Sequence, residues 1–122
     1  MSYMKSILIV DDDNLFLQSV KRGLTAMHED LNVYVAENGY EAFWVMGRVD
    51  IDLMVTDLRM PGMDGMELVR SARALHRDVP VIVTTAFCEP GADGVLKSLG
   101  VKVCLDKPLD IEELDAAIMA SL

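Results

Sequence analysis

Five short apolar runs alternate with amphipathic stretches along this chain of 122 residues. Unbroken runs of Val, Ile and Leu are typical of strands in a sheet that is covered on both faces. Between the runs, apolar residues recur every three or four positions, which is the spacing of a helix that buries one side. The pattern predicts strands at residues 6–10, 33–36, 53–56, 81–84 and 103–105, and helices at about 14–27, 39–46, 65–75, 90–99 and 111–120.

Three of the predicted helices carry an apolar stripe, and we expect an aspartate to cap the start of two of them. Asp64 and Asp110 stand where a carboxylate can accept hydrogen bonds from the free backbone N–H groups of a helix start. We expect the stripes to lie in the core, and they consist of Phe16, Val20, Leu24 and Met27, of Leu68, Ala72 and Leu75, and of Ile111, Leu114 and Ile118.

This alternation of strands and helices predicts an α/β fold in three layers, a doubly wound parallel sheet with helices on both faces. Right-handed crossovers leave few topologies, and we expect the flavodoxin-like one with five strands in the order 2-1-3-4-5. The length suits one domain with one core, so we expect residues 1–122 to form a single domain.

Polar or ionisable residues follow four of the apolar runs. Asp11 and Asp12 follow the first, Asp57 the third, Thr84 and Thr85 the fourth, and Asp106 and Lys107 the fifth. Because the carboxyl ends of parallel strands lie along one edge of a sheet, we expect these side chains to converge. Two carboxylates 4 Å apart repel by roughly 4 kcal/mol at a protein surface, so three of them need a cation. Magnesium prefers such oxygens, and Lys107 would supply a second positive charge.

The charge balance and the apolar runs argue against two classes of partner. With 20 acidic and 11 basic residues, the net charge of −9 opposes direct binding to nucleic acid. No apolar run approaches the roughly 18 residues of a membrane span, and residues 1–5 lack a secretory signal, so we expect a cytoplasmic protein without membrane contact. Cys88 and Cys104 are too few for a disulfide framework, and we expect two separate, half-buried thiols.

Four motifs carry a resemblance to a known family. ILIVDDD, DLMVTDLRMPGMDG, PVIVTTAF and CLDKP occur in this order, each around a predicted strand. Together they resemble the receiver domain of two-component response regulators, the CheY-like domains, and the likeness extends from Lys5 to about Leu122. One such motif alone would be weak evidence, whereas four in order, each in the right strand context, are highly specific.

The resemblance implies phosphoryl chemistry at the predicted site. Asp57 would be the phosphoacceptor, taking a phosphoryl group from a phosphohistidine on a partner protein. Thr85 would then hydrogen-bond the phosphoryl group, and Lys107 would form an ion pair with it. Members of the family usually have a cis peptide bond after this lysine, so we also expect one between Lys107 and Pro108.

The resemblance further implies a magnesium ion as the cofactor of this transfer. Asp12 and Asp57 would bind the ion directly, the backbone carbonyl of Arg59 would complete the protein ligands, and Asp11 would act mainly through water. An ionised aspartate can attack phosphorus, and a bound metal ion offsets the charge that grows on the phosphoryl oxygens.

The expected partners follow from the same resemblance. A sensor histidine kinase or a phosphotransfer protein would donate the phosphoryl group, and a downstream effector domain or target protein would respond to it. The sequence leaves open whether phosphorylation drives homodimer formation, and whether the chain is a stand-alone switch or the first domain of a longer regulator. Its end at Leu122, directly after the last predicted helix, favours the longer regulator.

Two features depart from the family pattern. Many receivers carry Tyr or Phe three residues before the lysine, where this chain has Cys104, and a thiol cannot sweep the area of an aromatic ring. Switching through that ring is therefore in doubt. Pro90, Gly91 and Gly94 give the fourth helix a poor start, so we expect this helix to be short or mobile, or to begin late.

Three other function classes share part of the pattern. A haloacid-dehalogenase-like phosphatase has two Asp spaced like Asp11 and Asp13, but it has Thr or Val where this chain has Leu15, and it leaves the motif around Asp57 unexplained. A flavodoxin or dinucleotide-binding module needs a phosphate-binding loop after Val10, which this chain lacks. The strongest alternative is a receiver-like interaction module without phosphoryl turnover, although every expected site residue is present.

Overall fold

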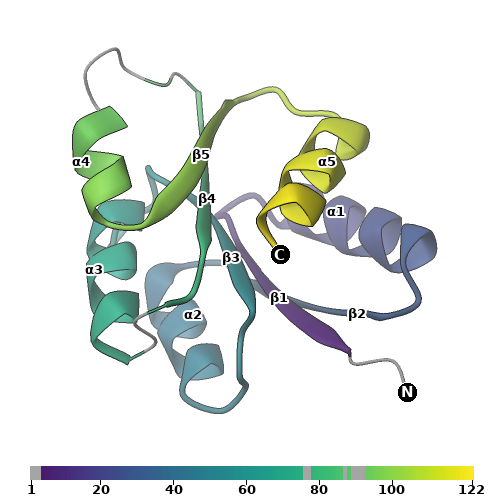
Figure 1. The fold of residues 1–122 in the computed structure, drawn as a ribbon, viewed down its shortest axis with the longest axis horizontal. Helices are drawn as coiled ribbons and strands as arrows, with labels where there is room; N and C mark the ends of the chain where they lie inside the picture. Colours follow the sequence, from purple (N-terminus) through teal and green to yellow (C-terminus); the bar gives the residue numbers. More distant parts are fainter. Residues whose placement is uncertain (1–3, 76–77, 87, 89–92) are drawn as a thin grey trace.

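A five-stranded parallel sheet with helices on both faces makes up the structure, a computed structural model that describes residues 4–75, 78–86, 88 and 93–122 (Figure 1). The strands are β1 (Lys5–Val10), β2 (Leu31–Ala36), β3 (Leu53–Asp57), β4 (Val81–Thr85) and β5 (Val101–Asp106). The helices are α1 (Asn14–Met27), α2 (Gly39–Met46), α3 (Gly65–Leu75), α4 (Asp93–Ser98) and α5 (Ile111–Ser121). The strand order β2-β1-β3-β4-β5 confirms the predicted flavodoxin-like topology.

The sheet separates two apolar layers. Helices α2, α3 and α4 cover one face, and α1 and α5 cover the other (Figure 1). Neighbouring residues of a strand point to opposite faces, so Leu8 and Val10 lie in the first layer while Ile7 and Ile9 lie in the second. Because both faces are covered, the strands read as unbroken apolar runs in the sequence.

The strands extend beyond their apolar runs, most importantly where they carry site residues. Asp57 is the last residue of β3 and pairs with Thr84, and Thr85 is the last residue of β4 and pairs with Asp106. Sheet hydrogen bonds are made by backbone groups, so a polar residue can pair as well as an apolar one. The predicted ends of these strands were therefore too early.

Two residues that were assigned to the core stripes are exposed. The side chains of Met27 and Leu75 are 45% and 48% exposed, so this part of the prediction was wrong. Each is the last residue of its helix, and Leu24 and Ala72, one turn earlier, are buried. The packed face thus ends one turn before the helix does. In α1 the buried set includes Leu17, which the stripe had left out.

The predicted helix starts at α3 and α5 are confirmed by side-chain hydrogen bonds. Asp64 Oδ1 accepts a hydrogen bond from the backbone N–H of Glu67 at 2.9 Å. Asp110 Oδ1 does the same for Glu113 at 2.8 Å. Each bond satisfies a donor that the first turn of a helix leaves free.

The structure describes the fourth helix from Asp93 to Ser98, inside the predicted range 90–99. Pro90 and Gly91 lie outside the described residues, so a short, late or mobile start of this helix stays a prediction. The peptide bond between Lys107 and Pro108, after β5, is cis, which confirms the sequence prediction.

The loop after β3 brings the start of α3 so close to the end of β3 that only glycine fits there. The backbone N–H of Gly65 donates to the Leu58 carbonyl at 2.9 Å. A Cβ atom on Gly65 would overlap the carbonyl oxygen of Asp57 and come within 2.7 Å of the Leu58 Cα atom. Both are backbone atoms, which cannot rotate away. Gly65 therefore sets how the chain leaves Asp57.

Substituting Gly65→Ala should lower the free energy of unfolding by about 2–4 kcal/mol, because the new methyl group must push the backbone of β3 away. Gly94→Ala in α4 is the matched control, since a Cβ atom there meets nothing within 4 Å. It should be neutral or stabilising by up to about 1 kcal/mol, the helix preference of Ala over Gly. Urea unfolding of both variants tests this, and equal stabilities would contradict it.

Candidate functional site

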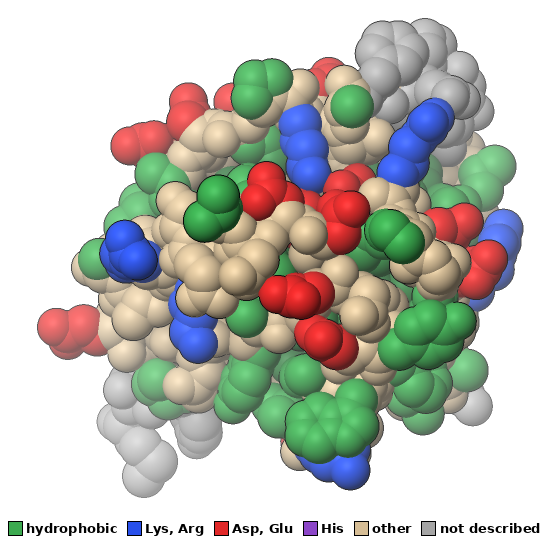
Figure 2. Space-filling model, turned by 180° about the vertical axis from the view of Figure 1, so that it is seen from behind, with side chains coloured by type: hydrophobic (Ala, Val, Ile, Leu, Met, Phe, Trp, Pro, Cys, Tyr) green, Lys and Arg blue, Asp and Glu red, His purple; other side chains and the backbone are tan. Residues whose placement is uncertain are grey.

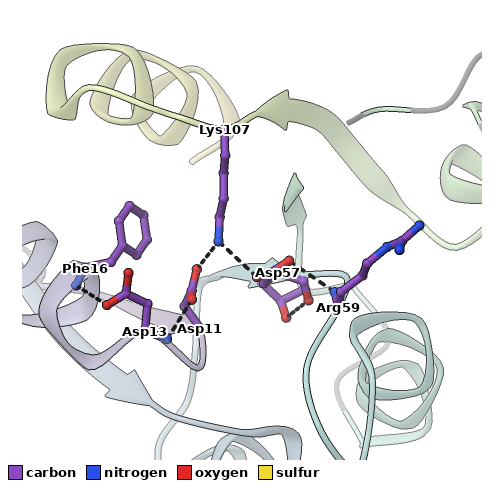
Figure 3. Close-up of polar contacts among 7 residues, drawn as sticks. Asp11, Asp13, Phe16, Asp57, Arg59 and Lys107 are labelled. Carbon is purple, nitrogen blue, oxygen red and sulfur yellow. Dashed lines mark hydrogen bonds and ion pairs between the residues drawn. The ribbon is translucent and has the colours of Figure 1, made fainter. Parts of the chain in front are cut away.

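Three charged side chains from three strand ends meet at the carboxyl edge of the sheet (Figure 3). Asp11 directly follows β1, Asp57 ends β3, and Lys107 directly follows β5. The Nζ atom of Lys107 lies 2.6 Å from Asp11 Oδ2 and 2.9 Å from Asp57 Oδ2. Asp57 and Lys107 follow Asp11 by 46 and 96 positions in the sequence, yet the three side chains are in contact. This confirms the predicted convergence for these three residues.

Both carboxylates are held in the same way. The Oδ1 atom of Asp11 accepts a hydrogen bond from the backbone N–H of Asp13 at 2.9 Å, and Oδ1 of Asp57 accepts one from Arg59 at 3.1 Å. In each case the donor lies two residues further along the chain, the spacing of an Asx turn. One oxygen of each carboxylate is thus held by its own loop and the other by Lys107 (Figure 3).

Asp12 completes a cluster of three carboxylates. One oxygen each from Asp11, Asp12 and Asp57 can be chosen so that all lie within 4.8 Å of one another. Asp11 and Asp57 are buried, whereas Asp12 is exposed at the surface. Acidic side chains gather near the middle of the face shown in Figure 2, with basic side chains beside them. Carboxylate oxygens at this spacing suit a hard divalent cation such as magnesium.

Burial and the contacts with Lys107 together set the pKa values of the site. Burial raises the pKa of Asp11, and repulsion from Asp57 adds to this, although the hydrogen bonds from Lys107 and the Asp13 N–H lower it in part. Burial alone would lower the pKa of Lys107, but its hydrogen bonds to the two carboxylates outweigh burial and raise it. Lys107 therefore stays protonated, and one ammonium group serves two carboxylates.

Thr85 and Arg59 are held beside this cluster through the backbone. The carbonyl of Thr85 accepts a hydrogen bond from the N–H of Lys107 at 2.7 Å, and the Thr85 side chain is buried. Thr84, its neighbour in β4, pairs in register with Asp57. Arg59 contributes the N–H that holds Asp57 Oδ1. All the residues that the sequence predicted for the site therefore lie at one edge of the sheet.

Two contributors to the site were missed in the sequence. The Nζ atom of Lys107 lies 5.4 Å from the centre of the Phe16 ring, within the range of a cation–π contact. Phe16 had been assigned to a core stripe, but it is only partly buried. The backbone N–H of Asp13 is the second, and the spacing of Asp11 and Asp13 could have indicated this Asx turn.

The two cysteines are joined in a disulfide bond, so the prediction of two separate thiols was wrong. Cys88 lies in the connection after β4, and Cys104 lies in β5 opposite Val83 of β4. They are 16 residues apart in the sequence, and the pairing of β4 with β5 brings their Cα atoms to 6.3 Å. Only this strand pairing, which local sequence patterns do not show, makes the bond geometrically feasible.

Comparison with known families and proteins agrees with this geometry. Residues 7–119 match the family of the response regulator receiver domain. The chain is 37% identical over 112 residues to the transcriptional regulatory protein GlrR of Escherichia coli, a match that covers 92% of this chain and 25% of that protein. It is 35% identical over 116 residues to the response regulator MprA of Mycobacterium leprae, covering 95% of this chain and 50% of MprA. The chain thus spans a quarter to a half of these relatives.

Solved structures of similar proteins share the fold over nearly the whole chain. The chemotaxis protein CheY4 of Vibrio cholerae superposes with a TM-score of 0.89 at 27% identity, covering 98% of this chain and 99% of CheY4. The response regulator TrrA of Thermotoga maritima, solved in complex with Mg(2+)-BeF, superposes with a TM-score of 0.81 at 29% identity, covering 98% of this chain and all of TrrA. The chain belongs to the response regulator receiver domain family, and it is a phosphoacceptor signalling domain.

Proposed function

We propose that Asp57 accepts the phosphoryl group, from a phosphohistidine of a sensor histidine kinase or phosphotransfer protein. The observation that carries this is the contact of Lys107 Nζ with Asp57 Oδ2 at 2.9 Å, at the centre of a carboxylate cluster. In the transfer, an Asp57 oxygen forms a bond to phosphorus while the bond from phosphorus to the histidine nitrogen breaks. Such a transfer depends mainly on positioning and charge.

Asp57 suits the nucleophilic role better than its two acidic neighbours. Asp11 is 1% exposed and burial raises its pKa, so its charge is costly to maintain. Asp12 is exposed, so water can compete for its oxygens. Asp57 is buried, but its two oxygens are each held by a hydrogen bond, from Arg59 and from Lys107. Its carboxylate is therefore oriented by both of its oxygens.

We assign the magnesium site to the same residues. Asp12, Asp57 and the backbone carbonyl of Arg59 would hold the ion, and Asp11 would act mainly through water. The spacing of the three carboxylates, within 4.8 Å, and the excess of negative charge support this assignment. When bound, the ion neutralises the carboxylates and orients the incoming phosphate. The structure of TrrA with Mg(2+)-BeF supports the choice of metal.

The phosphoryl group should change the partners of Thr85 and Lys107. It adds charge and acceptor oxygens at Asp57, so it can recruit the Lys107 ammonium into an ion pair and the Thr85 hydroxyl into a hydrogen bond. Both residues lie at the ends of neighbouring strands, β4 and β5, whose backbones are joined by the 2.7 Å bond from Lys107 to Thr85. Movement at the site would thereby reach the surface formed by α4, β5 and α5.

We further infer that residues 1–122 act as one receiver domain in the cytoplasm, the usual place of such domains. None of the helices in the described part of the chain is long and apolar enough to cross a membrane. The output would come from an effector domain or a target protein. This fits the relatives GlrR and MprA, of which the chain covers only a part.

Substituting Asp57→Asn should abolish the mass gain of one phosphoryl group when the protein is incubated with acetyl phosphate and magnesium, because the amide is not a nucleophile. Asp50→Asn is the matched control, because Asp50 is an exposed aspartate just before the start of β3. This variant should react like the unsubstituted protein. Intact-mass spectrometry measures both. If the Asp57→Asn protein were still phosphorylated, the phosphoacceptor would be another residue. If the unsubstituted protein did not react, the result would favour an interaction module without phosphoryl turnover.

Substituting Lys107→Met should raise the affinity for magnesium about fivefold, or by about 1 kcal/mol, because the ammonium and the ion compete for the same carboxylates. Lys102→Met is the control, since Lys102 is exposed on β5 and should leave the affinity unchanged. Isothermal titration calorimetry provides the comparison. Weaker binding by the Lys107 variant would show that the two cations cooperate instead.

Substituting Asp11→Asn should stabilise the metal-free protein at neutral pH. Because the folded state raises the pKa of Asp11, the contribution of this group to stability is largest at low pH and is lost as the pH rises through that pKa. Asparagine keeps the acceptor for the Asp13 N–H but carries no charge. We expect the unfolding midpoint in EDTA to rise by about 4 °C, roughly 1 kcal/mol for a domain of this size.

Magnesium should narrow the difference in unfolding midpoint between the Asp11→Asn variant and the unsubstituted protein, because the ion stabilises only the protein that binds it well. Thermal unfolding followed by circular dichroism, with and without magnesium, measures both effects. A lower midpoint for Asp11→Asn in EDTA would mean that its ion pair with Lys107 outweighs its burial.

A further inference from the structure

We propose that Cys88 and Cys104 are a reversible redox site, and that their oxidation restrains the phosphorylation switch. Their sulfur atoms are bonded, and their Cα separation of 6.3 Å lies within the range of ordinary disulfides. The chain has only these two cysteines, so no other thiol of the same molecule competes. The part of the proposal that concerns phosphorylation rests on the function proposed above.

Both cysteines are within reach of small reagents. Each side chain is partly exposed, unlike the fully buried thiols that are usually inert. Protein disulfides are uncommon in the cytoplasm, and those that occur there are mostly transient or redox-sensing. For a cytoplasmic receiver, the pair would consist of thiols under reducing conditions and form the bond when an oxidant appears.

The bond joins the connection after β4 to β5, close in the sequence to the two residues of the proposed switch, Thr85 and Lys107. Cys88 follows Thr85 by three residues, and Cys104 precedes Lys107 by three. The disulfide therefore joins the connection after Thr85 to the strand that leads to Lys107.

The covalent bond reinforces two weaker contacts between the same segments. The backbone N–H of Cys88 donates to Asp106 Oδ1 at 2.7 Å, and the N–H of Lys107 donates to the Thr85 carbonyl at 2.7 Å. In the reduced protein these hydrogen bonds can break and re-form when the phosphoryl group draws Thr85 towards it. In the oxidised protein the segment after Thr85 stays attached to β5, so oxidation should oppose this movement.

The chemistry needs an oxidant, and a small disulfide serves. One cysteine thiolate attacks a sulfur of the small disulfide and expels a thiolate, which gives a mixed disulfide. The second cysteine thiolate then attacks the protein sulfur of that mixed disulfide and expels the other small thiolate. The two cysteines lose two protons and two electrons, and the small disulfide becomes two thiols. A dithiol reductant reverses both steps.

The redox site is tested by equilibrating the full chain with reduced and oxidised glutathione at a series of ratios, then alkylating with iodoacetamide and measuring intact mass. We expect both alkylation sites to disappear together as the ratio becomes oxidising, with no glutathione adduct retained. Cys88→Ser and Cys104→Ser should each retain a glutathione adduct instead. Two alkylated cysteines, a retained adduct or a covalent dimer in the unsubstituted protein at the oxidising limit would overturn the proposal.

The coupling is tested by comparing rates of phosphorylation by acetyl phosphate and magnesium in the oxidised and reduced forms. We expect the oxidised protein to react about fivefold more slowly, a typical coupling between two sites. The Cys88→Ser/Cys104→Ser double variant is the matched control and should react at the reduced rate whether or not it has met the oxidant.

The outcomes separate the two proposals. Equal rates in the oxidised and reduced forms would overturn the coupling while leaving the function of Asp57 intact. No phosphorylation of the reduced protein would overturn the proposed function and the coupling with it. The alkylation experiment decides the redox site in either case, because it does not depend on phosphorylation.

Discussion

One ammonium group shared between two carboxylates is the interaction on which the site depends. Lys107 Nζ contacts Asp11 and Asp57, and it thereby connects the carboxyl ends of β1, β3 and β5. Removing Lys107 would leave two buried carboxylates without compensation, and an uncompensated buried charge typically costs about 3–5 kcal/mol. The three strand ends are therefore held together by charge as well as by the sheet.

The same contact leaves the negative charge of the pocket only partly balanced. The ammonium balances only part of the negative charge of three carboxylates. Burial raises the pKa of Asp11, and repulsion from Asp57 adds to it. A metal ion and a phosphoryl group each alter this balance, one by adding positive charge and the other by adding negative charge. In the function proposed above, Lys107 responds because its partners change, so the signal begins as a redistribution of ion pairs.

Much of the fold and site was predictable because it depends on local composition and on topology. Continuous apolar runs predicted strands covered on both faces, and the parallel sheet then required Asp11, Asp57 and Lys107 to meet. The ends of elements were less predictable. Met27 and Leu75 keep the helical spacing although their helices have passed the packed layer, and Asp57 and Thr85 join strands through backbone bonds that side-chain patterns do not reveal.

The disulfide was not predictable from local patterns, because it depends on strand register. Cys88 and Cys104 are brought together by the pairing of β4 with β5 and by the path of the chain after Thr85. The sequence indicated that Lys107 would contact acidic residues at the strand ends. It did not indicate which oxygen of each carboxylate Lys107 would contact. That choice follows from the hydrogen bonds that hold the other oxygens, from Asp13 and Arg59.

In the function proposed above, the hydrogen bond from Arg59 would also affect how readily Asp57 reacts. A free carboxylate rotates about its side-chain bonds and must lose that freedom before attack, which has an entropic cost. In this site the Arg59 N–H already fixes the rotation of the Asp57 carboxylate, and the turn that supplies it is part of the folded loop. The ordering is thus completed during folding, so an approaching donor meets an oxygen whose direction is already set.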